Sequence, residues 1–374
     1  WNTWNEFKIL VGNTWSFRMT ENFVSDEIVQ KISKFDSIIF DCDGVLVDIR
    51  KSYDYAINKT ISAIMKDIFN DDVSDIINSK ILYSLKASGG FNDEVSVVYT
   101  AILTLTASKK TNIPFEKLII DVIENSDESG ITSIDNFFIN SKIDLKEIKN
   151  KLDYTNSRKE SYIHKMFNQL FYGPELYEEI FNEKSSFSEK PLIDKDDIVL
   201  DENLMSKLKN RFGKKISTVT GRGNFAFSYS MKDFLENFDI EHSVFLEDRS
   251  LDLAKPNPDS LIESISGINS KCVLYVGDSM EDLKMVEKCK DKGLDVSFCG
   301  IYGSSDEPEL KYELFRKNNA SFIIESIQEL PKALNLVWWK SNKNLMKPRK
   351  TSIKRETKET SVSVTINLDG TGKT

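Results

Sequence analysis

The spacing of apolar residues divides the chain into strand–helix segments on either side of a long helical stretch. The apolar run at residues 37–40 predicts a buried strand. The preceding segment, residues 25–35, opens with a serine followed by two acids and predicts a helix. After Asp48 the apolar residues recur at the spacing of one helical face. The residues with this spacing are Ile57, Ile61, Ile64 and Ile68.

The next strand-like run, residues 215–219, follows only after a long interval. A parallel crossover needs about a dozen residues or somewhat more, so the interval must contain an inserted helical domain, which we place at residues 49–211. Residues 184–197 are polar and are interpreted as a linker back to the sheet. The segments with helical patterns are 73–88, 93–107, 114–124, 145–151 and 159–171.

From residue 215 onward, strand-like and helix-like runs alternate. With residues 37–40 they predict a six-stranded, mostly parallel sheet flanked by helices. This is an α/β, Rossmann-like core built from residues 36–48 and 212–335. The expected later strands are 216–219, 243–246, 273–276, 296–299 and 322–324, and the expected helices lie near 225–237, 258–265, 281–290 and 325–335.

The two ends of the chain have a different character. Residues 1–35 are interpreted as a lead segment, within which 7–12 are a candidate final strand of an upstream domain. Residues 336–350 are interpreted as a linker. Residues 361–368 alternate strictly between polar and apolar positions, which predicts an amphipathic strand, and we expect it to be unpaired and loosely docked. Because the sequence starts at Trp1 and stops directly after this run, we expect it to be a piece of a longer polypeptide.

Composition narrows the functional classes. Of the 374 residues, 40% are hydrophobic and 29% charged, as in ordinary globular proteins. The net charge of −9 argues against nucleic acid as the main partner, and no apolar run approaches the roughly 20 residues of a membrane span. The four cysteines lack CxxC spacing, which favours a reducing compartment. We therefore expect a cytoplasmic protein, with an organelle as the alternative.

The most informative stretch is the end of the first predicted strand. It carries Asp41 and Asp43, followed by Gly44, where a backbone can turn sharply. Open α/β sheets bind ligands at the carboxyl ends of their strands. Two carboxylates this close repel each other unless a cation or a proton lies between them. Taken alone, the pair could also be an acidic turn.

Three later segments of the predicted core also end in polar residues. The first is Thr220-Gly221-Arg222, and the second contains Lys255 shortly before a helix start. The third places Asp278 at a strand end and Asp282 one turn into the next helix. Each has an ordinary explanation as a turn, a surface charge or a helix cap. Their joint occurrence, in this order, indicates phosphate chemistry.

In these four motifs the chain resembles the haloacid dehalogenase superfamily of Mg-dependent phosphatases, over roughly residues 36–335. Asp41-Cys-Asp43-Gly-Val matches the first motif, Thr220 the second, Lys255 the third, and Gly277-Asp278-Ser-Met-Glu-Asp282 the fourth. The helical insertion resembles the cap of relatives of phosphoglycolate phosphatase. Haloacid dehalogenases proper lack an acid at the position of Asp43, so dehalogenation is disfavoured.

The resemblance implies a role for each motif residue. Asp41 would attack phosphorus, and Asp43 would act as general acid and then general base. Mg²⁺ would be held by Asp41, the carbonyl of Asp43, and Asp278, while Asp282 would orient neighbouring groups. The groups expected to bind the phosphoryl oxygens of a small phosphorylated metabolite are Thr220, Gly221 and Lys255.

The turn at Gly89, Gly90 and Phe91 lies between two predicted helices of the insertion. In related caps, a turn of this kind carries the substrate-specificity loop that reaches the active site. By that resemblance we expect Phe91 to contact the leaving group of the substrate. The alternative is that the two glycines only stop a helix.

The tail carries a second resemblance. Residues 349–372, with the run RxTKET and then LDGTG, resemble the opening of imidazoleglycerol-phosphate dehydratase, an enzyme of histidine biosynthesis. The alternative is an unrelated β-hairpin. If the resemblance holds, the parent protein is a phosphatase fused to a dehydratase, and histidinol phosphate becomes a candidate substrate. The chain has only two histidines, His164 and His242, so we expect no dehydratase activity from it.

Two alternatives to the phosphatase follow from the same motifs. The first is a phosphomutase or another phosphotransferase that uses the same nucleophile. The second is a non-catalytic partner of the dehydratase, which the four intact motifs argue against.

Overall fold

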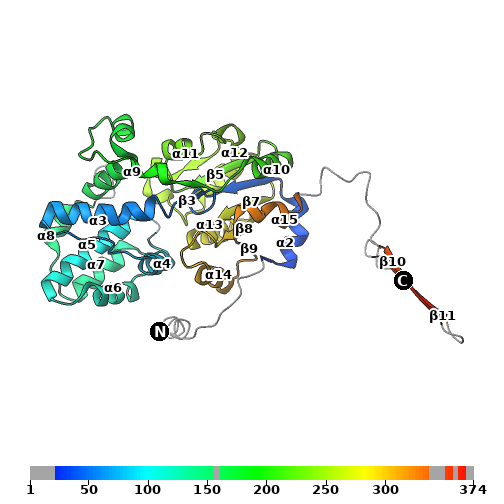
Figure 1. Ribbon diagram of the computed structural model, residues 1–374, viewed down its shortest axis with the longest axis horizontal. Helices are drawn as coiled ribbons and strands as arrows, with labels where there is room; N and C mark the ends of the chain where they lie inside the picture. The colour runs from blue at the N-terminus through cyan, green and yellow to red at the C-terminus, as the bar shows by residue number, and fades with distance from the viewer. Residues whose placement is uncertain (1–21, 92, 155–160, 337–349, 357–360, 368–374) are drawn as a thin grey trace.

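A mostly parallel sheet of seven strands forms the centre of one lobe of the molecule, in the order β1-β9-β8-β7-β2-β5-β6. The computed structural model describes residues 22–91, 93–154, 161–336, 350–356 and 361–367 (Figure 1). The strands are β1 (Phe23–Val24), β2 (Ser37–Phe40), β5 (Ile216–Thr220), β6 (Val244–Phe245), β7 (Val273–Gly277), β8 (Val296–Ile301) and β9 (Phe322–Ile324). The six expected strands are confirmed. The seventh, β1, pairs antiparallel with β9 at the edge of the sheet.

Strand β2 lies in the middle of the sheet, where all four of its residues are buried. Its apolar sequence suits this position. It pairs in parallel with β5 on one side and with β7 on the other. Side chains alternate between the two faces of a strand. Accordingly, Ile38 and Phe40 belong to the hydrophobic cluster on one face, and Ile39 belongs to the cluster on the other. This central strand places Asp41 at the carboxyl end of the sheet.

Helices cover both faces of the sheet. They are α2 (Asp26–Lys31), α10 (Glu202–Phe212), α11 (Asn224–Ser230), α12 (Asp259–Gly267), α13 (Met280–Asp291), α14 (Pro308–Lys317) and α15 (Leu330–Ala333). The first of them begins where the sequence predicted, because the Ser25 hydroxyl accepts the backbone N–H of Ile28. The hydrophobic residues of α2, α10 and α15 pack on one face, and those of α12, α13 and α14 pack on the other.

The insertion forms the second lobe, to the left in Figure 1, and it is helical as expected. Helix α5 is its centre, since every residue from Val95 to Ala107 is buried. Helix α7 was not expected from the sequence. Helix α9 contains a kink at Gly173, whose φ is 67°. The helices are α3 (Tyr53–Phe69), α4 (Ser79–Ala87), α5 (Glu94–Thr111), α6 (Phe115–Glu124), α7 (Ile131–Asn140), α8 (Lys146–Leu152) and α9 (Tyr162–Phe181).

A two-stranded antiparallel ribbon joins the lobes. It pairs β3 (Val47–Asp48), which leaves the sheet, with β4 (Asp197–Ile198), which returns to it. Helix α10 follows this ribbon, and its buried residues Leu204 and Leu208 belong to the cluster of the sheet. No helix was expected at these residues, and the chain up to residue 211 was assigned to the insertion. Its packing places it with the sheet instead.

The prediction of an unpaired strand at residues 361–368 is wrong. Strand β11 (Ser361–Asn367) pairs antiparallel with β10 (Lys350–Glu356), with Ile353 opposite Val364. The partner strand lies upstream, in a Lys- and Arg-rich stretch where no strand was expected. The lead segment up to residue 21, most of the expected linker and residues 368–374 lie outside the described residues.

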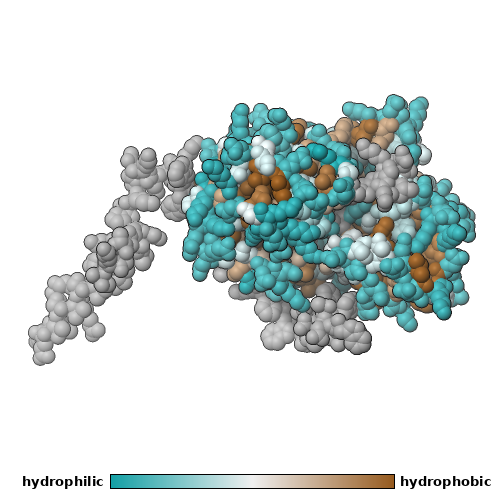
Figure 2. Space-filling model, turned by 180° about the vertical axis from the view of Figure 1, so that it is seen from behind, coloured by the Kyte–Doolittle hydropathy of each residue, from teal (hydrophilic) through white to brown (hydrophobic). Residues whose placement is uncertain are grey.

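The described surface is largely hydrophilic. Figure 2 shows this on the face opposite to Figure 1, where apolar patches are separate rather than continuous. The large apolar side chains most exposed among the described residues are Val29, Tyr55, Ile120 and Ile139. None of the described helices is long and apolar enough to cross a membrane.

The packing of α10 can be tested by truncating one of its buried side chains. Leu208 is fully buried in the cluster of the sheet. Leu208→Ala should therefore lower the free energy of unfolding by about 2–5 kcal/mol, through lost burial and a residual cavity. Chemical denaturation provides the measurement. Ser206→Ala, at an exposed position of the same helix, is the matched control, and equal effects of the two substitutions would contradict the assignment.

Candidate active site

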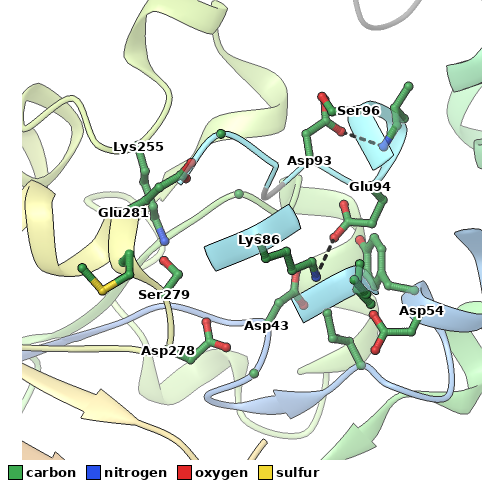
Figure 3. Close-up of a pocket in the computed structure, with 18 of the residues that line it drawn as sticks. Asp43, Asp54, Lys86, Asp93, Glu94, Ser96, Lys255, Asp278, Ser279 and Glu281 are labelled. Carbon is green, nitrogen blue, oxygen red and sulfur yellow. Dashed lines mark hydrogen bonds and ion pairs between the residues drawn. The ribbon is translucent and has the colours of Figure 1, made fainter. Parts of the chain in front are cut away.

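A cavity of about 610 Å³ lies between the carboxyl ends of the central strands and the insertion. Its lining residues come from both lobes. Figure 3 shows Lys255, Asp278 and Ser279 of the sheet lobe on one side, and Asp54, Lys86 and Glu94 of the insertion on the other. The acids of the first motif, Asp41 and Asp43, also line it. The chain thus brings most of the residues singled out from the sequence to one cavity.

Asp41 is the first residue after β2, and its carboxylate is held by Lys255. The Lys255 Nζ lies 3.0 Å from Asp41 Oδ2, and Asp41 Oδ1 accepts the backbone N–H of Cys42 at 2.7 Å. The same Nζ lies 2.7 Å from Asp282 Oδ1. Only 7% of the Lys255 side chain is exposed. One buried ammonium is therefore shared by two buried carboxylates.

Asp282 is completely enclosed, and its two oxygens accept five hydrogen bonds or ion pairs. Oδ1 accepts the Tyr275 hydroxyl at 2.9 Å as well as Lys255. Oδ2 accepts the backbone N–H groups of Asp278 and Ser279, both at 3.1 Å, and the Ser279 hydroxyl at 2.8 Å. Burial alone would raise its pKa, but the charge of Lys255 and these hydrogen bonds hold the pKa below the usual range. Asp282 therefore fixes Lys255 and the start of α13.

Burial has the opposite net effect on Asp41. Its pKa is raised to about 8, chiefly because burial disfavours the charged carboxylate. Lys255 acts against this rise, while the charges of Asp282, Asp278 and Asp43 add to it. Positive charge brought close to Asp41 would favour its ionised form.

Asp278 follows β7 and completes an acidic group with Asp41 and Asp282, whose nearest oxygens all lie within 4.8 Å of one another. Since the oxygens of Asp282 already accept five donors, Asp41 and Asp278 are the carboxylates available to a cation. Hard oxygen donors of this kind suit Mg²⁺. The close approach of Gly44 explains the glycine of the first motif: its φ is 73°, and a Cβ there would collide with the Asp278 carboxylate.

Asp43 makes an ion pair that was not expected from the sequence. The Arg222 Nη2 lies 2.6 Å from Asp43 Oδ1, and Arg222 Nη1 lies 2.7 Å from Asp196 Oδ2. Asp196 also accepts the hydroxyl of Ser52 at 2.6 Å. Ser52 precedes α3 and Asp196 precedes β4, so both entry and exit of the insertion connect to Asp43 through Arg222. Burial raises the pKa of Asp43, although Arg222 opposes the rise.

The two other residues expected to bind phosphate differ in position. Gly221 lies on the cavity wall, at an exposed turn. Thr220 is fully buried at the end of β5 and is not among the lining residues. Its hydroxyl accepts the backbone N–H of Arg222 at 3.2 Å. In this structure Thr220 therefore shapes the turn that presents Gly221 and Arg222.

The turn expected to determine specificity is only partly on the cavity. Gly89 and Gly90 line it, and the backbone of Gly90 packs so closely on Gly130 that a Cβ would lie 2.5 Å from the Gly130 nitrogen. Phe91 is fully buried in the hydrophobic core of the insertion and is not a lining residue. The structure thus places the glycines, but not the aromatic ring, on the cavity.

Charged residues of the insertion that were missed in the sequence also face the cavity. Lys86 Nζ lies 3.9 Å from Glu94 Oε1 (Figure 3). Asp54 Oδ1 is buried and has no hydrogen-bond partner among the described residues. Burial raises the pKa of Glu94 to about 7, with Lys86 opposing. In the sequence these positions read as ordinary helix charges, so no signal marked them.

Comparison with known proteins gives structural likenesses only. No family model and no curated protein matches the sequence. A solved target of the Northeast Structural Genomics Consortium has 17% identity and a TM-score of 0.55, covering 81% of this chain and 99% of its own. The phosphatase Tt82 from Thermococcus thioreducens has 23% identity and a TM-score of 0.49, and the match covers 74% of this chain and 98% of Tt82. A predicted phosphoglycolate phosphatase from Haemophilus somnus has 15% identity and a TM-score of 0.42, covering 80% and 98%. The first of these likenesses shows a shared α/β fold.

The raised pKa of Asp41 has a measurable consequence for the metal-free protein. The folded protein keeps a proton on Asp41 that the unfolded chain releases near pH 3.8, so this carboxyl lowers stability increasingly as the pH rises toward about 8. An amide has no proton to lose. The Tm of Asp41→Asn in EDTA should therefore rise relative to that of the natural protein between pH 4 and pH 8. A Tm difference that stays constant over this range would contradict the assignment.

Proposed function

We propose that the chain is a Mg-dependent phosphate monoester hydrolase of the haloacid dehalogenase superfamily, which acts through an aspartyl-phosphate. One observation carries the proposal. Asp41 stands at the end of the central strand, its carboxylate is held by Lys255, and Lys255 is fixed in turn by Asp282. This order of acid, ammonium and acid, with Asp278 beside it, brings together residues of the first, third and fourth motifs.

The proposed reaction has two displacements at phosphorus. An oxygen of Asp41 attacks phosphorus and the bond to the leaving alcohol breaks, while Asp43 gives that alcohol a proton. Asp43 then takes a proton from water, whose oxygen attacks phosphorus and releases Asp41 as the carboxylate. Asp43 lies two residues after the nucleophile and lines the same cavity, which suits this role.

The remaining groups offset the charge of the phosphoryl group. Lys255, 3.0 Å from Asp41, is placed to neutralise phosphoryl oxygens bound there. The backbone at Gly221 would add N–H donors. Mg²⁺ would be held by Asp41, the Asp43 carbonyl and Asp278, and it would supply further positive charge to the nucleophile and to the phosphoryl oxygens.

The proposed substrate is a small phosphorylated metabolite whose alcohol part extends toward the insertion. The insertion's wall carries the acids Asp54, Asp93 and Glu94 and the lysine Lys86. An excess of carboxylates favours a leaving group with positive charge. Histidinol phosphate, which carries an amine and an imidazole, fits this chemistry. It also fits the resemblance of the tail to a histidine-biosynthesis dehydratase, with which the phosphatase would form a fusion protein.

The roles of the first-motif acids can be separated by substitution. Asp41→Asn should abolish Mg-dependent phosphate release, because an amide is not a nucleophile toward phosphorus. Asp43→Asn should lower kcat by roughly 10²–10⁴-fold, through lost proton transfer. Phosphate release from an activated aryl phosphate measures both, with the exposed Asp233→Asn as control. Substantial turnover by Asp41→Asn would exclude the proposed nucleophile.

The proposed substrate class predicts a preference among phosphate esters. At equal concentrations, kcat/KM should be higher for histidinol phosphate than for the anionic phosphoglycolate. Asp54→Asn should reduce this ratio, because it removes a negative charge from the cavity wall. If the natural protein hydrolyses phosphoglycolate faster, the proposal of a cationic substrate is wrong. The phosphatase reaction itself would still be supported.

A further inference from the structure

Lys311 forms an ion pair with Asp278, one of the two carboxylates proposed to bind the cation. It lies on α14, one helix beyond the last of the four motifs, and lines the cavity. Its Nζ is 2.6 Å from Asp278 Oδ2, and its side chain is only 13% exposed. Neither the motifs nor the proposed reaction uses this residue. This largely buried ion pair lies at the same carboxyl end of the sheet as Asp41.

The two lysines of the site are held differently. Lys255 is shared between Asp41 and Asp282, so removing it would leave two buried carboxylates without their counter-charge. Lys311 has one carboxylate partner among the described residues, Asp278. Displacing Lys311 therefore breaks a single ion pair. Its long flexible stem lets the ammonium move into the cavity that it already lines.

The charge balance of the acidic group favours this displacement. Asp41, Asp278 and Asp282 carry three negative charges when ionised, and their ammonium partners are Lys255 and Lys311. With Lys255 retained and Lys311 withdrawn, the remaining charge of the group matches a divalent cation. With both lysines retained, a divalent cation would meet an ammonium at each of its two carboxylate ligands, Asp41 and Asp278, and the repulsion would be greater than with Lys255 alone.

We infer that Lys311 is an internal competitor of the divalent cation at Asp278 and thereby sets the cation concentration at which the site fills. The inference rests on the proposed cation site but does not depend on any phosphate ester being hydrolysed. A competing lysine and an orienting lysine have opposite effects on the affinity of the site for the cation. An orienting lysine would strengthen cation binding, whereas a competitor weakens it.

The test is calorimetric titration of the EDTA-treated and then dialysed full chain with Mg²⁺, repeated with Mn²⁺. Lys311→Met keeps much of the length of the side chain and removes its charge, so it should bind either ion about two- to fivefold more tightly than the natural protein. Lys311→Arg keeps the charge and should bind like the natural protein. Lys288→Met, at an exposed position of α13, is the charge-matched control and should also leave the affinity unchanged.

The outcomes separate this inference from the proposed function. Tighter binding by Lys311→Met alone, abolished when Asp278→Asn is added, would support it. Unchanged or weaker binding by Lys311→Met would overturn the competition while leaving the cation site intact. Absence of binding in every variant that still unfolds cooperatively would overturn both the competition and the proposed cation site.

Discussion

The buried ion pairs among Asp41, Lys255 and Asp282 are the constraint on which the rest of the site depends. A carboxylate at the end of a fully buried strand is costly to ionise, and the raised pKa of Asp41 expresses that cost. Lys255 offsets it but is itself buried, so it needs an acid with a depressed pKa. Asp282 meets this need because two backbone N–H groups and two hydroxyls already stabilise its charge. The start of α13, which follows the neighbouring strand β7, therefore supports Asp41 at the end of β2.

The connection between the lobes depends on a second buried cation. Arg222 pairs with Asp43 and Asp196, and Asp196 accepts the hydroxyl of Ser52. The general acid of the proposed reaction is thus tied to both chain segments that enter and leave the insertion. Any movement of the insertion that shifts Asp196 would change the environment of Asp43. Asp196 directly precedes β4, so it lies at the paired ribbon that joins the lobes.

Sequence patterns predicted the parts of this protein that depend on local chemistry. The strand before Asp41 and the motif residues Lys255, Asp278 and Asp282 could be recognised because each lies at a strand end or helix start. Lys311 could not, because a lysine in an amphipathic helix gives no sign of facing the sheet edge. Helix α10 was assigned to the wrong lobe for a similar reason: its apolar face predicts burial but not the partner. Strand β10 was missed because its charged residues resemble a linker.

The positions of Thr220 and Phe91 show a further limit. Both belong to segments that the sequence placed correctly near the cavity, but one hydroxyl is used within its own turn and one ring is buried in the insertion. A motif locates a backbone segment to within a residue or two. Which side chain of the segment faces the ligand depends on packing from elements far away in the sequence.

In the proposed reaction Asp41 forms a bond to phosphorus, and trapping that bond is the most direct test. The natural protein would be mixed with Mg²⁺ and a ³²P-labelled phosphate ester, quenched in acid within one turnover, and digested for mass spectrometry. We expect label on the peptide that contains residues 37–48, at Asp41, and we expect hydroxylamine to release it, as from an acyl phosphate. Label on another residue, or turnover without any label on the protein at the earliest times, would contradict it.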